Sequence, residues 1–258
     1  MMRKLILFIV LMLLTGCAGN SMTASSDYSD VDNKGYGWGI KKIQNQEPEV
    51  PDYIKKILTD NGGAYMGNGE EKKLYLTFDE GYENGYTEEI LKTLKEKKVP
   101  AAFFITGDYL NRSEDIVRKI IEEGHIIGNH TKGHKNLHKL TTYEQIANEI
   151  SALDDEFEAK FGYRMKYMRP PEGEYSARVL AVAKDMGYKT VFWSFAYKDW
   201  IADSTKGADY AVGQVMPYLH NGCIILLHAV SPDNAKALPE IIDRARGMGY
   251  EFCSLDDL

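Results

Sequence analysis

From Lys72 onward, short apolar runs alternate with longer amphipathic segments, and this alternation limits the possible folds more than any other feature of the chain. The apolar runs have the length and composition of buried strands. We predict strands at residues 74–78, 101–105, 125–128, 166–168, 190–193, 224–227 and 250–253. Strands that alternate with helices indicate an α/β protein, in which a parallel sheet is covered by helices.

The segments between the predicted strands have recognisable helix ends. Residues 87–97 are followed by Val99-Pro100, which stops a helix. Ser113 is a candidate N-cap for a helix that runs to Gly124. Thr141-x-x-Glu144 has the pattern of a capping box. Two further helices are predicted, one from Ser176 to near Gly187 and one over residues 234–248.

Polar side chains follow the predicted strands at their carboxyl ends. These side chains are Asp79 and Glu80 after the first strand, His130 after the third, Arg169 after the fourth, Asp199 past the fifth and His228 at the end of the sixth. A barrel collects residues from many strands at one mouth, whereas a doubly wound open sheet concentrates them near its switch point. The distribution therefore favours a barrel.

The first 34 residues have the features of an exported lipoprotein. A short basic region precedes an apolar run at 5–14, which is too short for a membrane span. The run ends in Leu14-Thr15-Gly16-Cys17, which resembles a bacterial lipobox. We predict a signal peptide over residues 1–16 and a flexible tether over 17–34. The protein would be anchored to the outer face of the cytoplasmic membrane by a lipid on Cys17. The alternative is an ordinary signal peptide and a secreted protein.

Charge and cysteine content exclude some functions. The net charge of −7 gives no basic footprint for nucleic acid. With Cys17 used for lipidation, only Cys223 and Cys253 remain, each in or beside an apolar run. We interpret both as small core residues rather than as a disulfide, and neither has a neighbouring histidine that would indicate a thiol nucleophile.

His130 and His134 are four residues apart, a spacing that places both imidazoles on one side of a helical turn. Two imidazoles that share one side can bind a metal ion. A pair with this spacing also arises by chance, so the pair alone leaves both explanations open. Thr131 stands where the zincin metalloproteases have a glutamate, which disfavours that class.

Asp79 and Glu80 end an apolar strand side by side. Adjacent carboxylates repel each other unless a cation or a strong donor lies between them. A divalent metal on one carboxylate would relieve the repulsion and would leave the other as a base for the metal-bound water. The alternative is a turn at the end of a strand with two exposed acids.

Arg169-Pro170-Pro171-Glu172 is stiff, because the prolines fix the backbone. The direction of the arginine side chain is therefore restricted. An arginine held in this way can keep a neighbouring carboxylate in its ionised form. A structural turn with a surface ion pair is the alternative.

His228 closes an apolar strand, as many ordinary core histidines do. A neighbouring carboxylate such as Asp199 would orient its ring and raise its pKa, which would make it a general acid.

Together these segments resemble the polysaccharide deacetylases, carbohydrate esterases that share the NodB homology domain. The five motifs of the family occur in order, and they are Thr77-Phe78-Asp79-Glu80-Gly81, His130-Thr131-x-x-His134, Arg169-Pro170-Pro171-Glu172-Gly173, Asp199-Trp200 and Leu226-Leu227-His228. The resemblance implies a distorted (β/α)7-type barrel over residues 71–258, with an N-terminal extension at 35–70 packed against it.

The resemblance also implies roles for the motif residues. Asp79 would be the general base, held by Arg169, and His228 the general acid, tuned by Asp199. One divalent metal ion, with zinc expected, would be bound by Glu80, His130 and His134. The implied substrate-binding residues are Tyr82, Pro170, Glu172 and Trp200.

Within the family the chain most resembles the branch that removes acetyl groups from N-acetylmuramic acid in peptidoglycan, on the route to muramic δ-lactam in spore cortex. The partner would be a peptidoglycan glycan strand, and we expect a monomer. Two residues depart from the pattern. Glu80 replaces the usual aspartate, and Glu172 stands where this branch has a basic residue. A glutamate there would repel the lactyl carboxylate unless Lys132 or Arg178 compensates.

Glu172 keeps open a second function, deacetylation of N-acetylglucosamine polymers or of O-acetylated sugars. A third possibility is a glycan-binding lipoprotein without activity. Loss of activity would predict a damaged base or acid, yet Asp79 and His228 are both present.

Overall fold

The computed structural model describes residues 28–202 and 204–258. The predicted signal peptide, Cys17 and most of the predicted tether lie outside these residues. The central sheet consists of seven parallel strands, which are β4 Lys73–Glu80, β5 Ala101–Ile105, β6 Ile126–Asn129, β7 Tyr167–Met168, β9 Lys189–Thr190, β10 Cys223–Leu227 and β11 Glu251–Phe252. Each of the seven predicted strands overlaps one of them, although β7 and β9 are only two residues long.

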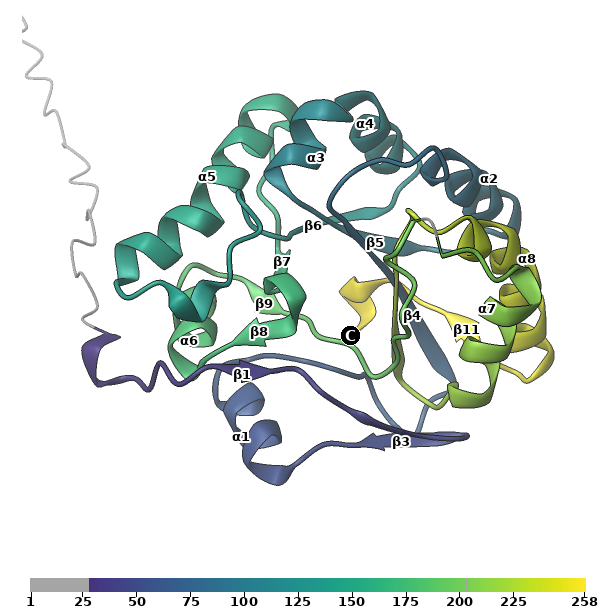
Figure 1. Ribbon diagram of the computed structural model, residues 1–258, viewed down its shortest axis with the longest axis horizontal. Coiled ribbons are helices and arrows are strands. Elements are labelled where there is room, and N and C mark those ends of the chain that lie inside the picture. Colours follow the sequence, from purple (N-terminus) through teal and green to yellow (C-terminus); the bar gives the residue numbers. More distant parts are fainter. Residues whose placement is uncertain (1–27, 203) are drawn as a thin grey trace, which may run out of the picture.

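The sheet curves into the distorted barrel that the sequence predicts (Figure 1). Its strands follow the order β10-β4-β5-β6-β7-β9, and β11 pairs in parallel with the start of β4. The segment after β9 returns to the other edge, because Phe195 forms a parallel bridge with Ile225 of β10. Within the described residues this is the one direct bridge between the two edges, and residues 64–66 add bridges to Val191 beside β9 and to Cys223 of β10.

Helices cover the outside of the barrel. They are α2 Thr87–Lys97, α3 Gly107–Arg112, α4 Glu114–Glu122, α5 Tyr143–Phe161, α6 Ala177–Asp185, α7 Ala208–Val215 and α8 Pro232–Gly247. The predicted range of α2 is confirmed. The capping box of α5 is displaced by one residue from the prediction, because Thr142, not Thr141, has the extended backbone and accepts from the Gln145 N–H. Ser113 precedes α4, but its side chain makes no capping hydrogen bond.

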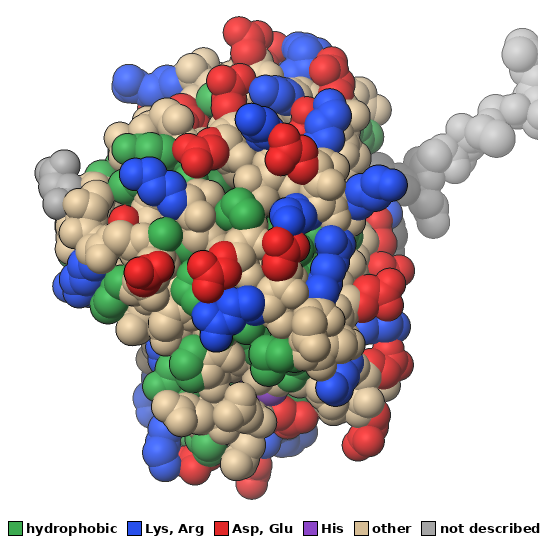
Figure 2. Space-filling model, turned by 90° about the vertical axis from the view of Figure 1, so that its right-hand side faces the viewer, with side chains coloured by type: hydrophobic (Ala, Val, Ile, Leu, Met, Phe, Trp, Pro, Cys, Tyr) green, Lys and Arg blue, Asp and Glu red, His purple; other side chains and the backbone are tan. Residues whose placement is uncertain are grey.

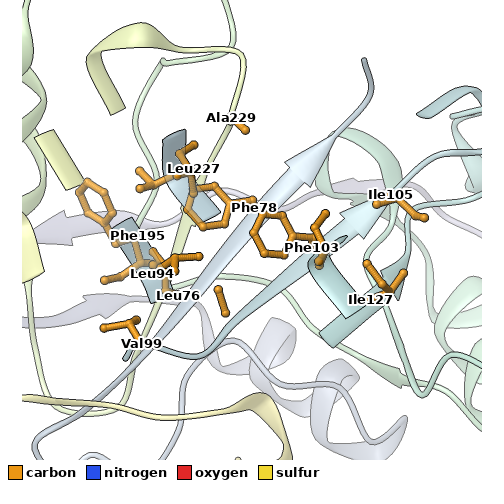
Figure 3. Close-up of a cluster of buried hydrophobic side chains, with 14 of the residues drawn as sticks. Leu76, Phe78, Leu94, Val99, Phe103, Ile105, Ile127, Phe195, Leu227 and Ala229 are labelled. Carbon is orange, nitrogen blue, oxygen red and sulfur yellow. The ribbon is translucent and has the colours of Figure 1, made fainter. Parts of the chain in front are cut away.

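Alternation along β4 divides its side chains between two cores. Leu76 and Phe78 face outward and pack with Phe103 of β5 and Leu94 of α2 (Figure 3). Tyr75 belongs to a separate cluster with Ala102, Phe104 and Ile224, which fills the barrel. Because successive residues of a strand point to opposite faces, Thr77 and Asp79 share the inward face with Tyr75. Glu80 follows Phe78 to the outward face.

The segment before the barrel packs against its side. It contains α1 Asp52–Asp60 and the strands β1 Tyr36–Gly37, β2 Lys41–Ile43 and β3 Gln46–Glu49. β1 pairs with β8, Glu174–Tyr175, and the Trp38 N–H donates to the Gly173 carbonyl at 2.8 Å. The Trp38 indole also donates to the Trp193 carbonyl at 2.9 Å. Trp38, Ile54 and Leu58 thereby form a third apolar cluster with barrel residues.

The residues ahead of β1 are held by side chains of the barrel domain. The Asn33 amide donates to the carbonyls of His138 and Leu140. The Arg178 guanidinium donates to the Val31 carbonyl through Nε and Nη2, at 3.1 and 3.0 Å. The chain is therefore attached to the domain over several residues before it reaches β1.

The surface and the cysteines agree with the expectations from composition. Figure 2 shows acidic and basic side chains interspersed on one face. Lys97 of α2 pairs with Asp243 of α8. Cys223 and Cys253 are both buried and free, as predicted. Among the helices of the described residues, none combines the length and the apolar content needed to cross a membrane.

Candidate active site

A pocket of about 950 Å³ opens at the carboxyl ends of the barrel strands. The predicted site residues that line it are Asp79, Tyr82, His130, His134, Glu172, Trp200 and His228. Arg169 and Asp199 are buried behind the pocket, where Arg169 binds Asp79 and Asp199 binds His228. Glu80 and Pro170 are not among its lining residues. The structure thus brings together residues from five of the seven strand ends.

Asp79 is held ionised by a buried arginine. Arg169 is fully buried, and its Nη1 donates to Asp79 Oδ1 at 2.7 Å. Three further donors of the guanidinium bind Thr77 Oγ1 and the carbonyls of Val191 and Phe192. Burial alone would raise the pKa of Asp79, but the charge of Arg169, followed by the interactions with the His130 and His228 rings, outweighs burial and lowers the pKa below its ordinary value.

His228 is oriented by a carboxylate on its far side. Asp199 Oδ1 lies 2.8 Å from His228 Nδ1, and Asp199 Oδ2 accepts from the His228 backbone N–H at 2.8 Å. Burial would lower the pKa of His228, but Asp199 outweighs it and raises the pKa above its ordinary value. The ring therefore presents Nε2 to the pocket and is suited to give up a proton there.

The two other histidines meet through a loop, not through a helical turn. Thr131 and His134 have positive φ angles of 68° and 52°, which end any helix between them. The rings are nevertheless close, with centroids 5.0 Å apart. His130 Nδ1 lies 2.8 Å from the Arg169 carbonyl, so Nδ1 carries the proton and Nε2 keeps its lone pair. Burial lowers the pKa of His130 to about 4 and keeps the ring neutral.

Glu80 is not brought together with the two histidines. It lies on the outward face of β4, fully buried, and neither carboxylate oxygen has a hydrogen-bond partner among the described residues. Burial, followed by the charges of Glu83 and Asp79, raises its pKa well above the ordinary value. Adjacent residues of one strand point to opposite faces, which explains why only Asp79 enters the pocket.

The donor set fits a divalent metal only in part. His130 and His134 supply two neutral nitrogen donors beside an open pocket, and Asp79 Oδ2 lies 3.6 Å from His130 Nε2. The third predicted ligand, Glu80, is directed elsewhere. Within residues 28–202 and 204–258, no three His, Cys, Asp or Glu side chains are grouped as metal ligands.

The mouth of the pocket combines aromatic and charged side chains. Tyr82 and Trp200 are 48% and 51% exposed, and the Trp200 ring lies 5.7 Å from the His228 ring. Exposed rings beside a deep pocket are suited to the apolar faces of sugars. Lys132 lines the pocket but is paired with Glu156. Arg178, the other cation considered from the sequence, donates to backbone carbonyls of the N-terminal segment and is not a lining residue.

Sequence reasoning missed Asn234 as part of the site. Its amide donates to Asp199 Oδ2 at 2.6 Å and to the His228 carbonyl at 3.1 Å. The Tyr197 hydroxyl donates in turn to the Asn234 side chain. Asn234 lies near the start of α8, where Ser231 caps the helix. A polar residue six positions after His228, at a capped helix start, was the available signal.

The chain is similar to known polysaccharide and peptidoglycan deacetylases. The model of the family described as polysaccharide deacetylase matches residues 66–191. PdaA of Bacillus subtilis, a peptidoglycan-N-acetylmuramic acid deacetylase, is 40% identical over 230 residues, which cover 88% of this chain and 87% of that protein. A peptidoglycan-N-acetylglucosamine deacetylase of Bacillus cereus is 32% identical over 199 residues, 76% of this chain and 71% of that protein.

A solved structure of a family 4 carbohydrate esterase also resembles this chain. The structure of Bacillus subtilis PdaA, a family 4 carbohydrate esterase, matches with a TM-score of 0.85 at 40% identity. The match covers 88% of this chain and 98% of that one.

Proposed function

Because this chain belongs to the polysaccharide deacetylase family, we propose that it hydrolyses the N-acetyl groups of peptidoglycan amino sugars. The observation that carries the proposal is that Asp79, ionised by Arg169, and His228, oriented by Asp199, line one pocket. Amide hydrolysis needs a base for the attacking water and an acid for the leaving nitrogen.

Asp79 acts as the general base. With its pKa held low it is ionised at neutral pH, and it accepts the proton of the water that attacks the acetamide carbonyl. Arg169 fixes the carboxylate through Oδ1, and Oδ2 remains free to accept the proton. The fixed orientation keeps the base ready before substrate arrives.

His228 acts as the general acid. It gives its Nε2 proton to the sugar nitrogen, which would otherwise leave as an amide anion. Asp199 stabilises the imidazolium before transfer and holds the ring in the required orientation. The backbone N–H of Glu172, at the wall of the pocket, is the proposed donor to the oxyanion. Acetate and a free amine are the products.

A divalent metal at this site would be held by His130 and His134, and we propose zinc from the two nitrogen donors. When bound, such an ion would polarise the carbonyl and lower the pKa of water. Deacetylases of this family are generally metal-dependent. Glu80 would have to leave the outward face of β4 to join the set.

We propose N-acetylmuramic acid as the sugar, supported by the 40% identity to PdaA. Removal of its acetyl group frees an amine beside the lactyl carboxyl, and these two groups can close to the δ-lactam. A second candidate is N-acetylglucosamine. Glu172 at the pocket favours it, because a glutamate repels an anionic substituent.

Acetate release from defined glycans tests the proposal. We expect release from peptide-free glycan strands, with the free amine on muramic acid, and loss of most activity after treatment with a chelator that zinc then restores. Mass spectrometry of the digested product locates the amine. Release from glucosamine residues alone would contradict the muramic assignment. Release that is unchanged by chelator would contradict the metal.

The pH profile of kcat/KM tests the acid and the base. Asp79 must be ionised, and since its pKa is lowered, the acidic limb is expected below the ordinary pKa of an aspartate. His228 must be protonated, and since its pKa is raised, activity is expected to persist above the ordinary pKa of a histidine before it falls. In Asp199→Asn the basic limb should move to lower pH. An unmoved limb in that variant would exclude His228 as the group that titrates.

Export and lipid anchoring would place the enzyme next to its peptidoglycan substrate. This localisation stays a prediction, because it rests on residues 1–17, which lie outside the described residues. An unmodified Cys17 in the mass spectrum of the mature N-terminal peptide would contradict it.

A further inference from the structure

The charged side chains that line the pocket differ in whether their charge is already matched. Asp79 is paired with Arg169, Asp108 with Arg112 and Lys132 with Glu156. Lys198 and Glu172 also line the pocket and are exposed. Within the part of the chain that the structure describes, neither Lys198 nor Glu172 has a hydrogen bond or an ion pair from its side chain. Lys198 is therefore the lining lysine whose charge is available to a ligand.

The backbone around Lys198 is fixed by the catalytic apparatus. Its neighbours Tyr197 and Asp199 are both buried, at 7% and 6% exposure, and both bind Asn234. Lys198 and Trp200 alternate with them and are exposed at the mouth. Trp200 contacts the His228 ring, so the lysine and the indole stand on the side of the pocket that holds the acid.

An aromatic ring next to a free cation is suited to a sugar that carries a carboxylate. The ring packs on the apolar face of the sugar, and the ammonium binds the anion. In muramic acid the lactyl ether is on the carbon next to the one that bears the acetamide. A substrate that presents its nitrogen to His228 therefore presents its lactyl carboxylate close by, and Glu172 repels that carboxylate from its own part of the wall.

We propose that Lys198 is the specificity residue that binds the free lactyl carboxylate of peptide-free muramic acid. The inference rests on the proposed function and assigns its substrate preference to one side chain. A stem peptide on the lactyl group removes this anion, so Lys198 also distinguishes strands without peptide from strands with it.

Kinetics on two matched glycans test the assignment. One is a peptide-free strand with free lactyl carboxylates, and the other is the same strand with those carboxylates converted to methyl amides. In Lys198→Gln we expect KM for the free acid to rise about tenfold with kcat little changed, and KM for the amide to stay the same. Lys198→Arg should keep the preference for the acid, and the preference of the wild type should weaken as salt is raised.

Lys132→Gln is the matched control, because this lysine lines the same pocket but is held by Glu156. A loss of the acid preference in Lys132→Gln and not in Lys198→Gln would overturn the proposal. Equal effects of Lys198→Gln on both glycans would also overturn it. Calorimetric binding of the two glycans to wild type and to Lys198→Gln repeats the comparison without turnover. Absence of acetate release would thus count against the proposed function, whereas equal binding of both glycans would count against Lys198.

Discussion

Replacing Asp79 with asparagine is expected to lower kcat/KM for acetate release by about 10²–10⁴-fold, the usual contribution of a general base. The amide has nearly the same shape and can still accept from Arg169 through Oδ1, but it cannot take the proton of the attacking water. The measurement is initial-rate acetate release from a peptide-free glycan.

Two controls separate this effect from damage to the fold. Circular dichroism and thermal unfolding show whether the variant is folded at the assay temperature, and zinc content shows whether metal uptake is intact. Asp108→Asn is a comparison variant, because Asp108 lines the same pocket and is paired with the exposed Arg112. Near-normal turnover by a folded, metal-loaded Asp79→Asn protein would show that Asp79 is not the general base.

Replacing Arg169 with methionine is expected to give the largest loss of stability, about 3–5 kcal/mol in the free energy of unfolding. Arg169 is fully buried and satisfies Asp79, Thr77 and two carbonyls, so its loss leaves a buried carboxylate without its cation. Its guanidinium also lies 4.2 Å from the centre of the Phe104 ring inside the barrel. Chemical denaturation monitored by tryptophan fluorescence measures the change.

The double variant Asp79→Asn/Arg169→Met isolates the cause. If the loss comes from an uncompensated charge, the double variant is expected to be more stable than Arg169→Met alone, since both charges are then absent. Additive losses would instead attribute the effect to packing. Arg244→Met is the comparison for a surface pair, because Arg244 and Glu240 are both about half exposed, and little change is expected there.

The barrel could be predicted because its central strands are buried on both faces. The strand β4 appears in the sequence as a run that is apolar except for Thr77 and stops at Asp79, and β5 was predicted to the residue. Strands β7 and β9 have two residues each, and they could be predicted only because they lie between predicted helices. The helix α7 was missed, since it follows a long loop and no polar residue caps it.

The site was less accessible to sequence reasoning than the fold. The spacing of His130 and His134 indicated a pair. The residue types Thr and His do not indicate the positive φ angles that Thr131 and His134 adopt in the loop between them. Asp79 and Glu80 stand together in the motif, although strand geometry sends them to opposite faces. Asn234 gains its importance from Asp199 and Tyr197, which are more than 30 residues away in the chain.

The attachment of the N-terminal segment has a mechanical consequence. β1 pairs with β8 directly after the Glu172-Gly173 wall, so tension along the N-terminus would pull on the pocket. The bonds of Asn33 and Arg178 precede that pair and act across the segment, so they would take up the load first. Force applied at the N-terminal end of the described residues would therefore load these bonds before it reached the Glu172-Gly173 wall.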